Sequence, residues 1–213
     1  CRVTIDGTVR DERSADGVTY SESVADIGEP AALGVTTSVL ANWTRGAIMD
    51  RVSSVLVDVG PGQLASASAD QLQADGTLNA LMVGAELVRF TTATLQSANP
   101  NIYRVSGLLR GQGGTEWAMN GHAVDEPVVL LRSRGLRRIT LAQADIGALR
   151  YYKGVTRGAL ADDAAAITIT AESIGQKPLA PVDLRASRDA DGGMLLTWKR
   201  RTRLVTNFCG PSG

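Results

Sequence analysis

Residues 107–119 read GLLRGQGGTEWAM, with four glycines and one arginine. Such a stretch either surrounds a phosphate or reverses the chain between two strands. A P-loop needs its second glycine where Gln112 stands, followed by a lysine. A dinucleotide-binding fingerprint starting at Gly111 needs glycine where Glu116 stands, and a carboxylate there repels a pyrophosphate. The stretch therefore predicts a tight turn that holds no ligand.

If the stretch is a turn, several of its residues have structural roles. Glycine accepts positive φ, so the chain can reverse sharply after the strand-like run IYRVSGLLR. We expect Thr115 to cap a single helical turn that begins at Glu116. We expect Arg110 to pair with Glu116 or Asp125. The predicted structural-turn residues are Gly107, Arg110, Gly111, Gly113, Gly114, Thr115, Glu116 and His122.

Alternating apolar and polar runs, separated by turn residues, recur along the chain and are typical of β-strands. They are clearest between residues 79 and 141, where the runs are LNALMVG, AELVRFTTATLQS, IYRVSGLLRG, EPVVLLRS and GLRRITL. Further runs are VSSVLVDV, RYYKGVT and AAAITITA. Only residues 64–74 and 115–119 favour a helix. The pattern predicts an all-β, mainly antiparallel fold with at most one or two short helices.

The character of the sequence changes at Gln176, where QKPLAP has the composition of a linker. Two strand-like runs then flank an Asp-Gly-Gly turn, and Trp198 lies on the second run. An immunoglobulin-like or fibronectin type III sandwich begins in this way but needs about 100 residues. We therefore predict a β-rich domain over 1–175, a linker over 176–181 and a truncated β-sandwich over 182–213.

Composition and charge argue against several classes of function. Lys plus Arg and Asp plus Glu number 22 each, so the formal net charge is zero and direct nucleic-acid binding is not expected. No apolar run approaches the roughly 20 residues of a membrane span. One histidine and two distant cysteines, Cys1 and Cys209, predict no metal site and no cofactor. The cysteine spacing favours two free thiols, with a disulfide or a lipid-modified Cys1 as alternatives.

Candidate catalytic groups are few. His122 is the single histidine, and Asp125 and Glu126 follow it closely, but no nucleophile elbow precedes it. Adjacent acidic residues on a strand point to opposite faces and do not form an acid/base pair. We expect no enzymatic activity in this segment. Basic residues on strands indicate contacts between strands or subunits, and the candidate interface residues are Arg137, Arg138, Trp198, Arg200, Arg201 and Arg203.

Residues 84–203 resemble the tail-tip hub proteins of siphophages and gene transfer agents, the large phage tail proteins of host-specificity type. The first matching block contains GAELVRF, YRVSGLLRGQGGTEWAM and GHAVDEPVVLL. The second contains KPLAP and WKRRTR, which in that family lead into a fibronectin type III-like domain. One departure is Gln112, where the family commonly has a basic residue. Matching residues of the first block are Gly84, Glu86, Phe90, Tyr103, Leu108, Arg110, Gly111, Gly114, Thr115, Glu116 and His122.

The resemblance implies a structural role in the virion. Hub proteins of this type form a β-rich, trimeric cap below the tail tube and link it to fibres or receptor-binding parts. It implies a homotrimer, contacts with other tail-tip or baseplate proteins and contact with host cell-surface glycans. A related hub protein of gene transfer agents also carries an upstream domain thought to act on glycans. The alternative is a carbohydrate-binding or accessory module of a cell-wall hydrolase, with Trp43, Trp117 and Trp198 stacking on sugars.

Overall fold

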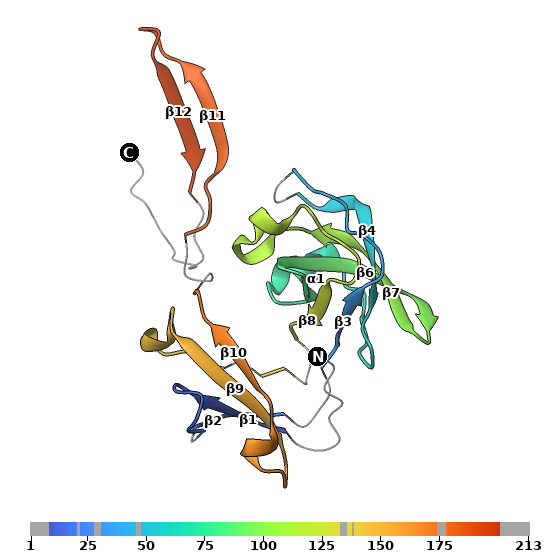
Figure 1. Cartoon of the computed structure of the whole chain (residues 1–213). Coiled ribbons are helices and arrows are strands. Elements are labelled where there is room, and N and C mark those ends of the chain that lie inside the picture. The colour runs from blue at the N-terminus through green and yellow to red at the C-terminus, as the bar shows by residue number, and fades with distance from the viewer. Residues whose placement is uncertain are drawn as a thin grey trace. The chain divides into compact units, whose positions relative to one another are not determined.

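The computed structural model describes residues 9–20, 22–27, 31–45, 48–132, 136–137, 139–173 and 178–200. The chain divides into two compact units, Cys1–Glu172 and Ser173–Gly213. The named strands pair antiparallel throughout, and the one α-helix in the described residues is short. The all-β, mainly antiparallel fold predicted from the sequence is confirmed (Figure 1).

Six strands of the first unit form a closed barrel in the order β3-β4-β7-β6-β5-β8. The strand β8 pairs with both β3 and β5 and so completes the ring. In a closed ring no strand keeps a free edge within the sheet. The bounds are β3 Leu33–Thr36, β4 Asp50–Asp58, β5 Ala80–Val83, β6 Glu86–Ala98, β7 Asn101–Leu109 and β8 Pro127–Leu130.

The barrel interior is filled by aliphatic side chains and one phenylalanine. Alternation along β4 turns Val55 and Val57 inward, Val59 directly after the strand follows the same pattern, and each of the three is almost fully buried. Phe90 of β6 and Leu108 of β7 are paired across the sheet and are also fully buried. Each such side chain contributes about 1.5–3 kcal/mol on burial. The remaining core residues are Leu40, Leu64, Leu81, Val83, Val88, Val105 and Val128.

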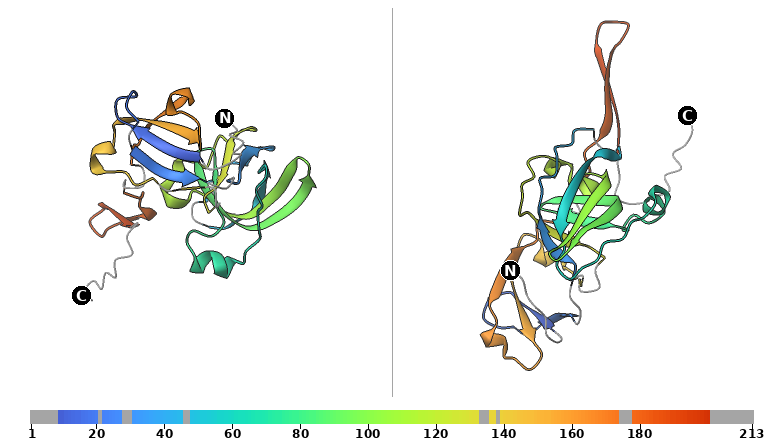
Figure 2. Two further views of the ribbon diagram at one scale, coloured as in Figure 1. Left: turned by 90° about the horizontal axis from the view of Figure 1, so that it is seen from below. Right: turned by 90° about the vertical axis from the view of Figure 1, so that its right-hand side faces the viewer.

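The long β6–β7 hairpin extends beyond the barrel, as Figure 2 shows (left, green). The far end of β6 is mostly exposed, and Leu95 is 50% exposed. The part of β6 nearer the barrel is covered by the segment before α1. There the Ala67 amide donates to Thr91 O, and Ser66 exchanges hydrogen bonds with the backbone of Ala93.

This pairing corrects the helix predicted over residues 64–74. The helix α1 spans only Ala69–Ala74, because residues 65–68 lie extended along β6. Ser68 caps it in a capping box with Gln71, and Leu72 is its buried residue. At the other end, Arg89 of β6 donates to the carbonyls of Leu72 and Asp75. Its guanidinium thus satisfies carbonyl groups that a helix end leaves without partners.

A second sheet of the first unit has the order β10-β9-β1-β2 (Figure 1). Its strands are β1 Val9–Ser14, β2 Glu22–Ile27, β9 Leu149–Thr156 and β10 Ala166–Thr170. Asp145 joins two of these strands, because its carboxylate pairs with Arg13 of β1 at 3.0 Å and with Arg150 of β9 at 2.9 Å.

The strand predicted from the run GLRRITL is wrong for the described residues. Residues 136–137 and 139–141 lie in no strand. The run follows β8, which already closes the barrel, so the barrel offers no edge to a further strand. The alternating pattern alone does not form a strand without a neighbour to supply hydrogen bonds.

The described part of the second unit is a hairpin of β11 Val182–Arg188 and β12 Met194–Lys199. Its turn is held by Asp189, whose carboxylate accepts the amides of Asp191 and Gly193. Residues 201–213 lie outside the described residues, so the fibronectin type III-like domain stays a prediction. Trp198 is 59% exposed within this hairpin.

Candidate functional site

The glycine stretch lies at the end of β7 and turns the chain through two short 3-10 helices, Gln112–Gly114 and Glu116–Ala118. Gly111, Gly113 and Gly114 all have positive φ, the conformation for which glycine was expected. Gly111 is also closely surrounded, since a Cβ there would lie 2.8 Å from Met119 Sδ and 2.9 Å from Glu116 Cα. Both the backbone conformation and the space therefore require glycine.

Arg110 stands immediately before this turn and is the largest fully buried side chain in the described residues. Its Nε and Nη2 donate to the Glu86 carboxylate at 2.9 and 2.8 Å. Its Nη1 donates to Ala41 O and its Nη2 to Met119 O. Nη1 also lies 3.5 Å from Asp50 Oδ2. The guanidinium thus donates hydrogen bonds to both Glu86 oxygens and to two backbone carbonyls, and it lies at ion-pair distance from Asp50 Oδ2, which accepts no hydrogen bond.

Glu86, the first residue of β6, is fully buried and accepts from three different residues. Its Oε1 accepts the Gly111 amide at 2.6 Å as well as Arg110 Nε. Its Oε2 lies 2.8 Å from Arg110 Nη2 and 2.9 Å from His122 Nε2. A buried carboxylate is tolerated only when its oxygens are paired in this way.

His122 lies between two carboxylates and is nearly buried, with 3% of its side chain exposed. Nε2 faces Glu86 Oε2, and Nδ1 lies 2.7 Å from Oε2 of Glu126. An imidazole nitrogen donates only when it carries a proton, so both contacts are hydrogen bonds when the ring is doubly protonated. Through these contacts the ring ties the loop before β8 to the start of β6.

Asp50, the first residue of β4, completes the cluster from the opposite side of Arg110. Its Oδ1 accepts the amides of Val52 and Ser53. Burial acts to raise the pKa of Asp50, but hydrogen bonds from Ser53 and Val52 and the charge of Arg110 outweigh it, and the pKa is lowered. Asp50 therefore stays ionised beside the buried guanidinium. We call Asp50, Glu86, Arg110, His122 and Glu126 the buried charge cluster.

Two expected contacts of the turn are wrong. Arg110 pairs with Glu86 and Asp50, not with Glu116 or Asp125. Thr115 stands at the N-cap position of a helical turn that begins at Glu116, as predicted, but its side chain makes no capping hydrogen bond.

The Oγ1 of Thr115 instead donates to Gln112 O and accepts the Leu87 amide. Both errors have one cause: the register that pairs Arg89 with Leu109 brings the start of β6 to the end of β7. The turn therefore contacts residues distant in sequence.

Sequence reasoning gave no role in the turn to Glu86 or Asp50. The signal for Glu86 was present, because a glutamate opening an otherwise apolar run, Glu-Leu-Val, must find a cation once the run is buried. Asp50 carried no such signal, since Asp before an exposed arginine at position 51 resembles an ordinary turn residue.

The residues predicted for an interface lie elsewhere. Arg137 is exposed and donates to Leu136 O. Trp198 and Arg200 are exposed in the second unit. Arg138, Arg201 and Arg203 lie outside the described residues. The assignment of these residues to an interface stays a prediction.

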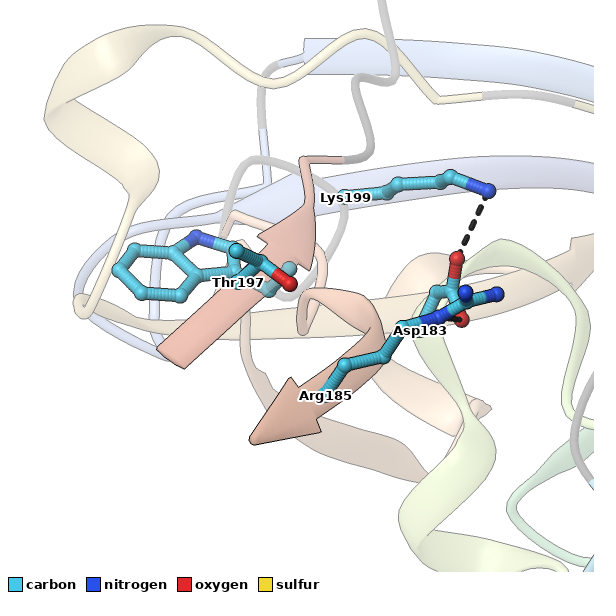
Figure 3. Close-up of a pocket in the computed structure, with 5 residues that line it drawn as sticks. Asp183, Arg185, Thr197 and Lys199 are labelled. Carbon is cyan, nitrogen blue, oxygen red and sulfur yellow. Dashed lines mark hydrogen bonds and ion pairs between the residues drawn. The ribbon is translucent and has the colours of Figure 1, made fainter. Parts of the chain in front are cut away.

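The hairpin of the second unit carries a shallow pocket lined by Asp183, Arg185, Thr197, Trp198 and Lys199 (Figure 3). Asp183 Oδ2 pairs with Lys199 Nζ at 2.7 Å, and its Oδ1 pairs with Arg185 Nε at 2.9 Å. The basic run after Trp198 predicts pairing between strands, and Lys199 of β12 pairs in this way with Asp183 of β11. These hydrogen bonds and charges lower the pKa of Asp183. The pocket's charges thus satisfy one another.

The three tryptophans differ in their surroundings. Trp43 is buried, and its amide donates to the backbone and side chain beside the turn, at Met119 and Asn120. Trp117 is 67% exposed on the second 3-10 helix. Of the tryptophans considered for sugar stacking, Trp117 and Trp198 are accessible and Trp43 is not.

In the described part of the chain, no group of three or more His, Cys, Asp or Glu side chains is arranged to hold a metal ion. No helix among those residues combines the length and apolar character that crossing a membrane requires.

Among curated proteins the chain has no match. Residues 31–129 match the model of a family described as "Rcc01698-like, C-terminal", a name associated with proteins of gene transfer agent type. This segment begins just before β3 and ends inside β8, so it coincides with the closed barrel and contains the whole buried charge cluster. The barrel is therefore the part of this chain that is similar to the Rcc01698-like, C-terminal family.

Proposed function

We propose that the chain is a structural segment of the tail-tip hub of a bacteriophage or gene transfer agent. It assembles as an oligomer, which we expect to be a homotrimer, and links the tail tube to fibre or receptor-binding parts. In this role it serves host attachment and DNA delivery without catalysing a reaction. The match of the barrel to a family of gene transfer agent type supports the proposal, as does the tail-protein resemblance of the glycine stretch.

The single observation that carries the proposal is the buried charge cluster. Three ionisable residues of the tail-protein motif, Glu86, Arg110 and His122, are directed at one another. Their hydrogen-bonding groups are engaged in joining the ends of β4, β6 and β7 to the loop before β8. A motif used in this way specifies a rigid building unit, which is what a particle component requires.

Location in the particle tests the proposal. The full-length protein, tagged at a surface loop, should sediment with purified particles and be labelled by gold-conjugated antibody at the distal end of the tail. Native mass spectrometry of the isolated full-length protein should give a closed oligomer. Recovery only in the particle-free fraction, with a monomeric mass at high concentration, would contradict the proposal.

The exposure of Trp117 favours a second candidate function, a carbohydrate-binding module. An exposed indole can stack on a sugar ring, and Trp117 is two-thirds exposed beside the glycine turn. Pull-down with purified peptidoglycan distinguishes the two functions. Binding that is lost in Trp117→Ala but kept in Trp43→Phe, a buried control, supports the module, whereas no binding by the unaltered chain excludes it.

A further inference from the structure

Within the part of the chain that the structure describes, the outer strand β10 of the four-stranded sheet has an open edge. Among those residues it pairs with β9 alone, over Ala166 to Thr170, and is the last strand on its side (Figure 1). All five of its residues are exposed. Ile167 is 61% exposed and Ile169 is 47% exposed. Both isoleucines point to the same face of the sheet, since they are two residues apart.

The edge of β10 lacks the features that usually prevent strand addition. Proteins protect outer strands with charged residues, proline or a bulge. The sequence of β10 is AITIT, and its register with β9 is continuous. The opposite edge of the same sheet differs, because β2 carries an exposed Asp26 and its pairing with β1 contains a register shift. The outer strands β11 and β12 also carry charged residues.

The charges around β10 restrict what can pair with it. Asp162 and Asp163 precede the strand and Glu172 follows it, and all three are exposed. Arg157 is the one basic residue of this stretch, residues 157–172. Two copies of β10 paired antiparallel about Thr168 would bring Asp162 and Asp163 of one copy to the same end of the sheet as Glu172 of the other. Like charges gathered at each end repel one another, so the charges disfavour a second copy as the occupant.

We propose that β10 is a strand-addition site for an extended segment of a different protein chain, with alternating apolar residues and a lysine or arginine near each end. The backbone of the segment would continue the sheet. Its apolar side chains would cover Ile167 and Ile169, and its basic ends would pair with the acidic residues at the two ends of β10. This inference goes beyond the proposed function and does not depend on it.

The test uses the full chain and two labelled peptides, KKVTVTVKK and EEVTVTVEE. Fluorescence anisotropy should show that the basic peptide binds at least about tenfold more tightly than the acidic one. Its binding should weaken between about 50 and 500 mM salt. Hydrogen exchange should slow at the amides of Ala166 to Thr170 and not in β2.

Variants assign the binding to this edge. Ile167→Lys and, separately, Thr168→Lys should weaken binding of the basic peptide about tenfold or more. Ser23→Lys, which places the same charge on the opposite edge, should leave binding unchanged. Circular dichroism of each variant verifies that the sheet is retained.

Three results would overturn the inference. They are equal binding of the acidic peptide, no binding of either peptide, and concentration-dependent dimerisation of the chain that Thr168→Lys abolishes. The last result would identify a second copy as the occupant.

Discussion

The guanidinium of Arg110 and the carboxylate of Glu86 meet in a two-pronged pair, with Nη2 2.8 Å from Oε2 and Nε 2.9 Å from Oε1, and neither side chain is exposed. The two residues stand at the end of β7 and at the start of β6. The pair therefore holds together β6 and β7, the two strands of the barrel with the most extensive pairing.

Replacing Arg110 by lysine should destabilise the chain strongly. Lysine donates from one nitrogen and cannot reach Glu86, Ala41 O and Met119 O together. We expect Arg110→Lys to lower the free energy of unfolding by about 3 kcal/mol, because the bidentate pair with buried Glu86 is lost and buried carbonyl groups are left without a donor.

Urea unfolding measures the change. The control is Arg104→Lys at an exposed position of β7, which should stay within about 0.5 kcal/mol of the unaltered chain. An Arg110→Lys chain as stable as the control would show that the pair is dispensable.

The contact between β3 and β4 at Gly34 should not tolerate a methyl group. A Cβ on Gly34 would lie 1.6 Å from Asp58 O and 3.0 Å from Val59 Cα, both on the backbone. Gly34→Ala should therefore cost about 3 kcal/mol or more by forcing β3 away from β4.

Gly76 provides the matched control, since nothing lies within 4 Å of its Cβ position. Gly76→Ala should be neutral or stabilise by up to about 1 kcal/mol. Thermal unfolding of both variants compares them, and equal midpoints would contradict the close contact at Gly34.

Acid should destabilise the four-stranded sheet through Asp145. A hydrogen bond from the Ala142 amide, one from Arg150 and the charge of Arg13 lower the pKa of Asp145 in the folded chain. The folded pKa then lies below the unfolded value of about 3.9. The stabilisation is complete above that value and is lost as the pH falls through the folded pKa.

Asp145→Asn should reduce stability at neutral pH and flatten its loss on acidification. Thermal unfolding between about pH 7 and pH 3 measures both effects. Asp162→Asn, an exposed change of the same charge, should leave the profile unaltered. Parallel profiles for Asp145→Asn and the unaltered chain would contradict the role of Asp145.

The capping box of α1 should contribute measurably although it is exposed. Ser68 Oγ accepts the Gln71 amide at 3.1 Å, and Gln71 Oε1 accepts the Ser68 amide at 2.8 Å. Ser68→Ala should cost about 1 kcal/mol, whereas Ser68→Asp should restore most of it. Chemical unfolding of the two variants decides, and an aspartate variant as unstable as the alanine variant would point away from capping.

The sequence was sufficient for the strands and turns that local patterns determine. The run VSSVLVDV forms β4, and Gly60-Pro61 ends it in a turn. The positive φ of Gly111 follows from the same local reasoning. The partner of Arg110 could not be predicted in this way, because the choice among Glu86, Glu116 and Asp125 depends on the register between two strands.

The failed strand after β8 has a comparable cause. The run GLRRITL has the alternation of a strand, but whether it forms one depends on a free edge beside it. Closure of the barrel depends on all six strands together and cannot be inferred from the GLRRITL run alone. Local pattern therefore predicted the element type well and the neighbours of each element poorly.

The way β8 closes the ring governs when the barrel can form during synthesis. Its four residues, Pro127–Leu130, join β3 and β5, and Glu126 and His122 precede it directly. While the ribosome still encloses these residues, Glu86 lacks its histidine and both β3 and β5 have open edges. The barrel of the nascent chain therefore cannot close until β8 emerges from the ribosome. A chain released before that point would expose the unpaired edges of β3 and β5 to neighbouring chains.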